Sequence, residues 1–134
     1  MARELLLLSG MKSRLLMLDD ELPILKAMST YFELSGYAVD YTAEREEAEA
    51  LLVNNNYACL IVDLRLTAHG ADGLDVLSFV RERAPSTRVV ILTAYGSPAV
   101  EREARRRGVD AFLQKPRPLA EVLSVVGALV GASS

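Results

Sequence analysis

Short apolar runs alternate with longer amphipathic segments along the whole chain. Unbroken apolar runs bounded by polar or turn-forming residues predict buried strands of a parallel sheet. The segments between them repeat their apolar positions with helical spacing. Strands are predicted at 13–18, 37–41, 58–63, 88–93 and 109–113, and helices at 20–35, 43–53, 74–84, 97–107 and 119–130.

This alternation predicts an α/β fold, a flavodoxin-like doubly wound five-stranded parallel sheet in the order 2-1-3-4-5. Right-handed crossovers would place helices on both faces of the sheet. The 134 residues suffice for one domain. We expect that domain to cover 13–131, after an N-terminal extension at 1–12 and before a C-terminal tail at 132–134.

Local signals support these helix ends. Gly36 follows the first helical segment, at a position where a left-handed residue commonly ends a helix. Ser97 and Pro98 are a typical N-cap and first helical residue.

Composition narrows the class of protein. Apolar residues make up 51% and charged residues 25%, which is typical of a globular domain, and the net charge of −3 gives no general attraction to nucleic acid. Cys59 is the only cysteine and lies in an apolar run. A single cysteine excludes an intrachain disulfide and a CxxC site.

No apolar run approaches the roughly 18 residues of a membrane span, and the four leucines at 5–8 are too short for a signal peptide. We therefore expect a cytoplasmic protein with no membrane partner.

Four of the predicted strands end at residues that phosphoryl chemistry uses. Asp19 and Asp20 follow the first strand, Asp63 the third, Thr93 ends the fourth and Lys115 follows the fifth. Ligands of open α/β sheets bind beyond the carboxyl ends of the strands, so these side chains are expected to meet there. Clustered carboxylates suit Mg²⁺. Zinc is a poor candidate, because no histidine or thiolate lies near these carboxylates in the sequence.

A carboxylate beside a cation, an ammonium group and a hydroxyl can attack phosphorus to give an aspartyl phosphate. Each residue also has an ordinary structural explanation: Asp20 as a helix N-cap, Asp63 in a turn, Thr93 as a strand former and Lys115 as a solvated charge. The coincidence of all four at one edge favours the chemical interpretation.

The four motifs in this order resemble the receiver domains of two-component response regulators, over about residues 13–130. The motifs are LLMLDDE, LIVDLRL, ILTAYGS and DAFLQKP. The resemblance implies that Asp63 accepts a phosphoryl group from a histidine kinase or a phosphotransfer protein. It also implies that Asp19, Asp20, Asp63 and the backbone carbonyl of Arg65 hold Mg²⁺.

The resemblance further implies a conformational switch. Thr93 would hydrogen-bond the phosphoryl group, and Phe112 would turn inward when Thr93 moves. Lys115 would pair with a phosphoryl oxygen, and the bond from Lys115 to Pro116 would be cis. Such a protein is not an enzyme acting on external substrates, although it would catalyse phosphoryl transfer to Asp63 and hydrolysis from it.

The chain departs from the family pattern around the predicted pocket. Thr67 stands where the family usually has a proline, and the loop from Thr67 to Asp72 reaches Gly73 about two residues later than in the family pattern. This loop contains His69, the only histidine. Arg65 and Tyr95 occupy positions that tune the lifetime of the phosphorylated state, and Arg117 stands where many relatives have phenylalanine.

Three alternatives remain open. A phosphatase of the haloacid-dehalogenase type needs an acid where this chain has Arg65, and a nucleotide- or flavin-binding module needs a glycine-rich turn where it has Asp19 to Glu21. A degenerate receiver would act as a phosphorylation-independent interaction domain.

We expect a downstream protein partner to bind the face formed by residues 97–119. The arginines of this face would contact an acidic partner or a second copy in a homodimer. No DNA-binding element follows residue 131, so direct DNA binding is not expected.

Overall fold

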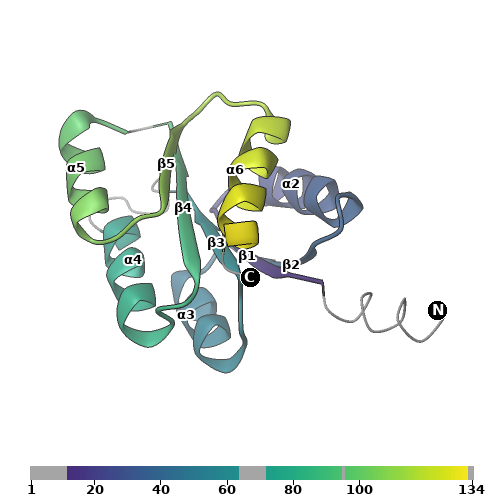
Figure 1. Cartoon of the computed structure of the whole chain (residues 1–134), viewed down its shortest axis with the longest axis horizontal. Helices are drawn as coiled ribbons and strands as arrows, with labels where there is room; N and C mark the ends of the chain where they lie inside the picture. The colour runs from purple at the N-terminus through teal and green to yellow at the C-terminus, as the bar shows by residue number, and fades with distance from the viewer. Residues whose placement is uncertain (1–11, 64–71, 95, 133–134) are drawn as a thin grey trace.

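The computed structural model describes residues 12–63, 72–94 and 96–132. A central parallel sheet has the order β2-β1-β3-β4-β5, with helices on both faces (Figure 1). The strands are β1 (Arg14–Leu18), β2 (Ala38–Thr42), β3 (Cys59–Val62), β4 (Arg88–Thr93) and β5 (Ala111–Gln114); the helices are α2 (Leu22–Leu34), α3 (Arg45–Asn54), α4 (Asp72–Arg83), α5 (Pro98–Arg106) and α6 (Leu119–Ala132). The predicted fold class and strand order are confirmed.

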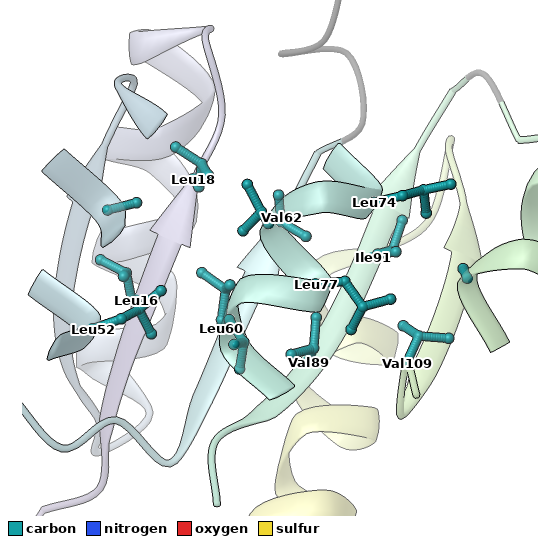
Figure 2. Close-up of a cluster of buried hydrophobic side chains, with 14 of the residues drawn as sticks. Leu16, Leu18, Leu52, Leu60, Val62, Leu74, Leu77, Val89, Ile91 and Val109 are labelled. Atoms are coloured by element: carbon teal, nitrogen blue, oxygen red, sulfur yellow. The ribbon is translucent and has the colours of Figure 1, made fainter. Parts of the chain in front are cut away.

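The two faces of the sheet form two separate halves of the core. Along β1, Leu16 and Leu18 pack with α3, α4 and α5, whereas Leu15 and Met17 pack with α2 and α6. Figure 2 shows the first half, where leucine, isoleucine and valine side chains from the sheet meet those of α3 and α4. The inner strands β1, β3 and β4 are largely apolar because both faces of the sheet are covered, whereas the edge strand β2 carries Asp40 and an exposed Tyr41.

Several element boundaries differ from the prediction by one or two residues. One of these is β5, which begins at Ala111 rather than at residue 109. The backbone N–H of Val109 donates to the carbonyl of Ala104 (3.1 Å), so Val109 still belongs to the turn that leaves α5. The predicted helix ends are confirmed: Gly36 has φ +106°, and the Ser97 hydroxyl accepts a hydrogen bond from the N–H of Val100 (3.2 Å). None of the described helices combines the length and the apolar character needed to cross a bilayer.

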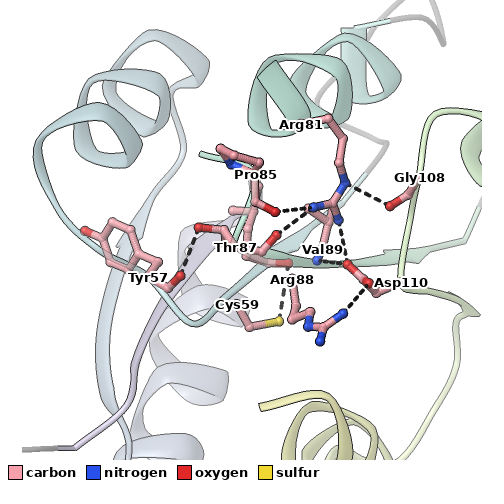
Figure 3. A network of polar contacts seen from close by, with 10 residues as sticks. Tyr57, Cys59, Arg81, Pro85, Thr87, Arg88, Val89, Gly108 and Asp110 are labelled. Carbon is pink, nitrogen blue, oxygen red and sulfur yellow. Dashed lines mark hydrogen bonds and ion pairs between the residues drawn. The ribbon is translucent and has the colours of Figure 1, made fainter. Parts of the chain in front are cut away.

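A network of hydrogen bonds and ion pairs lies at the start of β4 and connects it to neighbouring segments (Figure 3). The Arg81 guanidinium, from α4, donates to the carboxylate of Asp110 (2.6 Å) and to the backbone carbonyls of Thr87 (3.0 Å) and Gly108 (3.0 Å). The Asp110 carboxylate also accepts the backbone N–H of Val89 (2.7 Å). One guanidinium and one carboxylate therefore join α4, the start of β4 and the segment that leads into β5.

We expect Asp110→Ala to lower the free energy of unfolding by roughly 2–4 kcal/mol, because it leaves the N–H of Val89 without its acceptor and removes the carboxylate that neutralises the partly buried Arg81 guanidinium, which keeps its hydrogen bonds to backbone carbonyls. Urea denaturation measures the change. Glu121→Ala, which removes an exposed ion pair with Arg117, is the matched control and should cost less than about 1 kcal/mol. Equal losses in the two variants would contradict this account of the network.

Candidate functional site

Two buried aspartates lie side by side at the carboxyl ends of β1 and β3. Their backbones are fixed by the sheet: the N–H of Asp19 donates to the carbonyl of Thr42 (3.3 Å), and the N–H of Asp63 donates to the carbonyl of Leu18 (3.0 Å). Each residue is only 3% exposed. The side chains of Asp19 and Asp63 are also within hydrogen-bonding reach of each other. This pair occupies the point where the strand order reverses, as the sequence predicted.

The Lys115 ammonium group bridges the two carboxylates. Its Nζ lies 2.7 Å from Oδ2 of Asp63 and 3.5 Å from Oδ2 of Asp19. The backbone N–H of Lys115 donates to the carbonyl of Thr93 (2.8 Å), which fixes the start of the lysine relative to the end of β4. The Lys115–Pro116 peptide bond is cis, as the sequence predicted.

Burial and charge shift the proton affinities of this site. Burial, reinforced by the neighbouring charge of Asp63, raises the pKa of Asp19 to about 6, despite the lowering effects of a backbone hydrogen bond and of Lys115. Burial alone would lower the pKa of Lys115, but the hydrogen bond and charge of Asp63, together with Asp19, raise it. Lys115 therefore stays positively charged, whereas the raised pKa of Asp19 brings its protonation close to the neutral range.

Two further acids, Asp20 and Glu21, lie next to Asp19. Asp19, Asp20 and Glu21 each offer a carboxylate oxygen, and these three oxygens lie within 4.8 Å of one another. Glu21 was not predicted to be a metal ligand, although it directly follows the pair Asp19 and Asp20 in the sequence, which was the one sign of this role. Buried and exposed carboxylates gathered in this way are the hard oxygen donors that Mg²⁺ prefers, so the residues fit the ion that the sequence suggests.

Asp20 is not the N-cap of α2. Glu21 occupies that position, and its side chain makes no capping hydrogen bond. Instead, the carboxylate of Asp19 accepts the backbone N–H of Glu21 (3.0 Å) and so stabilises the turn into the helix. The exposed Asp20 side chain is therefore not engaged in capping α2.

Thr93 and Phe112 lie on the neighbouring strands. Thr93 is fully buried and pairs with Gln114 in the ladder between β4 and β5. The ring of Phe112, 8% exposed, packs beneath Gly96, where an added Cβ would lie 2.8 Å from the ring atom Cε1. The Gln114 amide donates to the carbonyl of Gly96 (3.2 Å). The loop after Thr93 is thus tied to β5 at Gly96.

Other predicted features lie outside the described residues. These are the backbone carbonyl of Arg65, the residues Thr67, His69 and Tyr95, and the extension at 1–11. Arg117 is described: its guanidinium donates to the carbonyl of Gln114 (3.3 Å) and pairs with Glu121 (3.4 Å). It therefore lies beside the site without contacting the aspartates.

An open groove of about 430 Å³ adjoins the bridging lysine, between α2 and the start of α6. Apart from the charged groups of Lys115 and Arg117, its lining is apolar: Ile24, Met28, Leu92, Ala94, Pro116 and Leu119. Lys115 therefore contacts the acid cluster and also lines a largely apolar groove.

The arrangement of sheet, acid cluster and lysine defines a regulatory domain of a known class. Residues 15–127 match the model of the response regulator receiver domain. The chain therefore belongs to the response regulator receiver domain family, which favours this assignment over the phosphatase and the nucleotide- or flavin-binding module.

Named relatives are regulatory proteins. The chain is 35% identical over 122 residues to the photosynthetic apparatus regulatory protein RegA of Cereibacter sphaeroides, covering 91% of this chain and 65% of RegA. It is 32% identical over 123 residues to the transcriptional regulatory protein ResD of Bacillus subtilis, covering 92% of this chain and 50% of ResD. The chain thus spans between half and two thirds of these relatives.

A solved structure of a response regulator from Burkholderia pseudomallei superimposes with a TM-score of 0.80 and 26% identity, covering 90% of this chain and 70% of that one. That protein holds a phosphorylated aspartic acid, a calcium ion and citrate.

We expect Asp19→Asn to stabilise the protein at pH 7.5 in the presence of a chelator, by on the order of 1–3 kcal/mol. The raised pKa of Asp19 means that the folded state binds a proton between about pH 4 and pH 6 that the unfolded state releases, so stability falls as the pH rises through this window. The gain should shrink toward zero near pH 4. Denaturant titrations at both pH values measure it.

The exposed Asp20→Asn is the control and should show no comparable gain. A destabilised Asp19→Asn protein at pH 7.5 would show that the ionised carboxylate is favourable there.

Proposed function

We propose that this receiver domain, covering residues 13–131, accepts a phosphoryl group on Asp63 from the phosphohistidine of a histidine kinase or a phosphotransfer protein. The observation that carries the proposal is the Lys115 ammonium group, 2.7 Å from the buried Asp63 carboxylate and next to the acid cluster of Asp19. The phosphorylated aspartic acid in the Burkholderia pseudomallei relative supports the same chemistry here.

In the proposed reaction, a carboxylate oxygen of Asp63 attacks the phosphorus atom. An O–P bond forms, the P–N bond to the donor histidine breaks, and the imidazole leaves with the electron pair of that bond. Lys115 is already paired with the Asp63 carboxylate and would follow the developing negative charge onto the phosphoryl oxygens. Attack of water on the resulting acyl phosphate releases inorganic phosphate and restores the carboxylate, so no external substrate is turned over.

We further propose that Asp19, Asp20, Asp63 and the backbone carbonyl of Arg65 hold Mg²⁺. When bound, the ion would neutralise charge on the acids and on the transferring phosphoryl group. Without a cation, the phosphoryl group would have to approach the carboxylates of Asp19 and Glu21 against electrostatic repulsion. The carboxylate oxygens of Asp19, Asp20 and Glu21 lie within 4.8 Å of one another, and Asp63 shares the Lys115 ammonium group with Asp19, which supports a cation site at this place.

The phosphorylated state is proposed to reach a partner through the face formed by residues 97–119. Thr93 would move toward the phosphoryl group, and Phe112, whose ring lies against Gly96, would turn further inward as Thr93 moves. Helix α5 is weakly held by the core, because within this helix only Ala104 is buried and Val100 is partly buried. A segment with few buried contacts moves at low cost. The partner is a downstream protein or a second copy of this chain.

Asp63→Asn should abolish phosphorylation. We expect wild-type protein incubated with a small phosphodonor and Mg²⁺ to gain one base-labile phosphoryl group by intact-protein mass spectrometry, and to lose this gain when Mg²⁺ is chelated. Glu121→Gln, which changes an exposed distant acid, should behave like wild type.

Base-labile phosphoryl mass on the Asp63→Asn protein would place the acceptor elsewhere. A wild-type protein that never gains this mass would favour the degenerate receiver.

Reversal of charge at Arg105 and Arg106 should weaken partner binding without stopping phosphorylation, since both side chains are exposed on α5, far along the helix from the acid cluster. Binding of the downstream partner to phosphorylated protein, measured by titration calorimetry, should fall about tenfold or more. Because each arginine pairs with a glutamate of its own helix, circular dichroism must show that the double variant remains helical. Unchanged partner affinity in a well-folded variant would contradict the role of these arginines.

A further inference from the structure

Helices α3 and α5 lie at opposite ends of one layer of the fold. Together with α4 they cover the same face of the sheet, and α4 lies between the other two (Figure 1). Each of the two outer helices buries little of its surface: Ala48 and Leu52 are the buried residues of α3, and Ala104 is that of α5. Both helices therefore present a long exposed stripe of side chains to solvent.

The exposed stripe of α3 is acidic at its N-terminal end and apolar toward its C-terminal end. Glu46 and Glu47 are exposed in the first turn, and within the described ranges neither forms an ion pair. Ala50 and Val53 follow at helical spacing, and Val53 is 48% exposed. Arg45, the one basic residue of α3, is paired with an acid in the next turn of the helix (3.0 Å). The negative charge of the first turn is thus left uncompensated by its own helix.

The exposed stripe of α5 has the reverse order. Pro98 and Ala99 are exposed at its N-terminal end. Arg102 and Arg106 follow at helical spacing toward its C-terminal end, and the side chain of Arg106 is 80% exposed. Arg102 forms no ion pair with the part of the chain that the structure describes, and the pair of Arg106 with Glu103 is long, at 3.5 Å. Positive charge is therefore exposed at the C-terminal end of α5.

The two stripes are complementary when one helix runs antiparallel to the other. The acidic end of α3 then faces the arginine end of α5, and Ala50 and Val53 face Pro98 and Ala99. The same orientation sets the positive N-terminal end of the α3 dipole against the negative C-terminal end of the α5 dipole. Within one chain α4 separates these helices, so a contact between them requires two copies.

We infer that α3 of one copy docks antiparallel on α5 of a second copy, with Glu46 and Glu47 against Arg102 and Arg106. The two surfaces differ, so the contact is heterologous, and a pair of copies still has one α3 and one α5 free to bind further copies. The inference names a partner for the face at 97–119 and rests on the proposed function for that role alone, because the contact requires neither a phosphoryl group nor a metal ion. Exposed charges make the association weak and sensitive to salt.

Sedimentation equilibrium of the whole chain tests this contact. At low ionic strength, we expect the weight-average mass of the wild-type protein to rise with protein concentration above the mass of one chain. In about 1 M salt, where the Debye length is about 3 Å, this rise should largely disappear. Glu46→Arg with Glu47→Arg, and separately Arg102→Glu with Arg106→Glu, should each lower the association constant about tenfold or more.

Restored charge complementarity should restore the association. An equimolar mixture of the two double variants again brings acidic and basic stripes together, as does one chain with all four substitutions. Each should associate with a constant within about threefold of wild type. Glu33→Arg with Glu121→Arg makes the same change of net charge as the α3 variant at exposed positions of α2 and α6, and should leave the association unchanged. Val53→Ser should weaken it without altering any charge.

The variants of α3 need a control for folding. Arginines in the first turn of a helix oppose its dipole, so circular dichroism must show that each variant remains helical. Glu46→Gln with Glu47→Gln removes the negative charge without adding positive charge, and should also weaken the association.

A wild-type protein that remains monomeric at every concentration in low salt would overturn the inference. So would association that persists in both folded double variants, since it would indicate a contact elsewhere, or a folded chain with all four substitutions that remains monomeric. Asp63→Asn should associate like wild type. Failure of wild-type Asp63 to gain phosphoryl mass would overturn the proposed function but leave this contact in place, so the two failures are distinguishable.

Discussion

The contact between the Lys115 ammonium group and the buried carboxylates of Asp63 and Asp19 is the interaction on which the site depends. Two ionised carboxylates at one sheet edge repel each other, and burial increases this repulsion. Lys115, directly after β5, compensates part of the negative charge of these carboxylates. The negative charge that remains favours the binding of a divalent cation. The fold makes this arrangement possible because the parallel register of β1, β3, β4 and β5 brings distant chain segments to one edge. The sheet therefore sets where the acids and the lysine meet, since each of them directly follows the end of a strand.

The sequence predicted the sheet well because its strands are apolar on both faces, as at Leu15 and Leu16, and such runs have few alternative structures. It was less accurate where side chains define the ends of elements. β5 begins at Ala111 because Val109 completes the turn after α5. Helix α2 begins after Glu21 because the Asp19 carboxylate accepts the N–H of that residue. Such hydrogen bonds depend on where the backbone lies in the folded protein, and the spacing of apolar residues in the sequence does not reveal this.

The site was predictable to the extent that strand ends coincide with functional residues. Asp19, Asp63, Thr93 and Lys115 were all recognised in this way, and their positions at one edge follow from the topology. Glu21 was missed because an acid at the start of a helix has a sufficient local explanation in the helix dipole. The contact of Arg81 with Gly108 was not predictable either, since 27 residues separate them and no sequence pattern links an arginine with a backbone carbonyl.

The close approach of Gly96 to the Phe112 ring links two positions that are distant in sequence. An added Cβ at residue 96 would lie 2.8 Å from the ring and 2.9 Å from the Gln114 amide, so an alanine there requires the aromatic ring or the loop to shift. A smaller side chain at residue 112 would remove one of these two conflicts and open space for a bulkier loop. In the divergence of this lineage, the sizes of residues 96 and 112 are therefore expected to change in a compensatory manner, with mutation at one position restricting which substitutions are tolerated at the other.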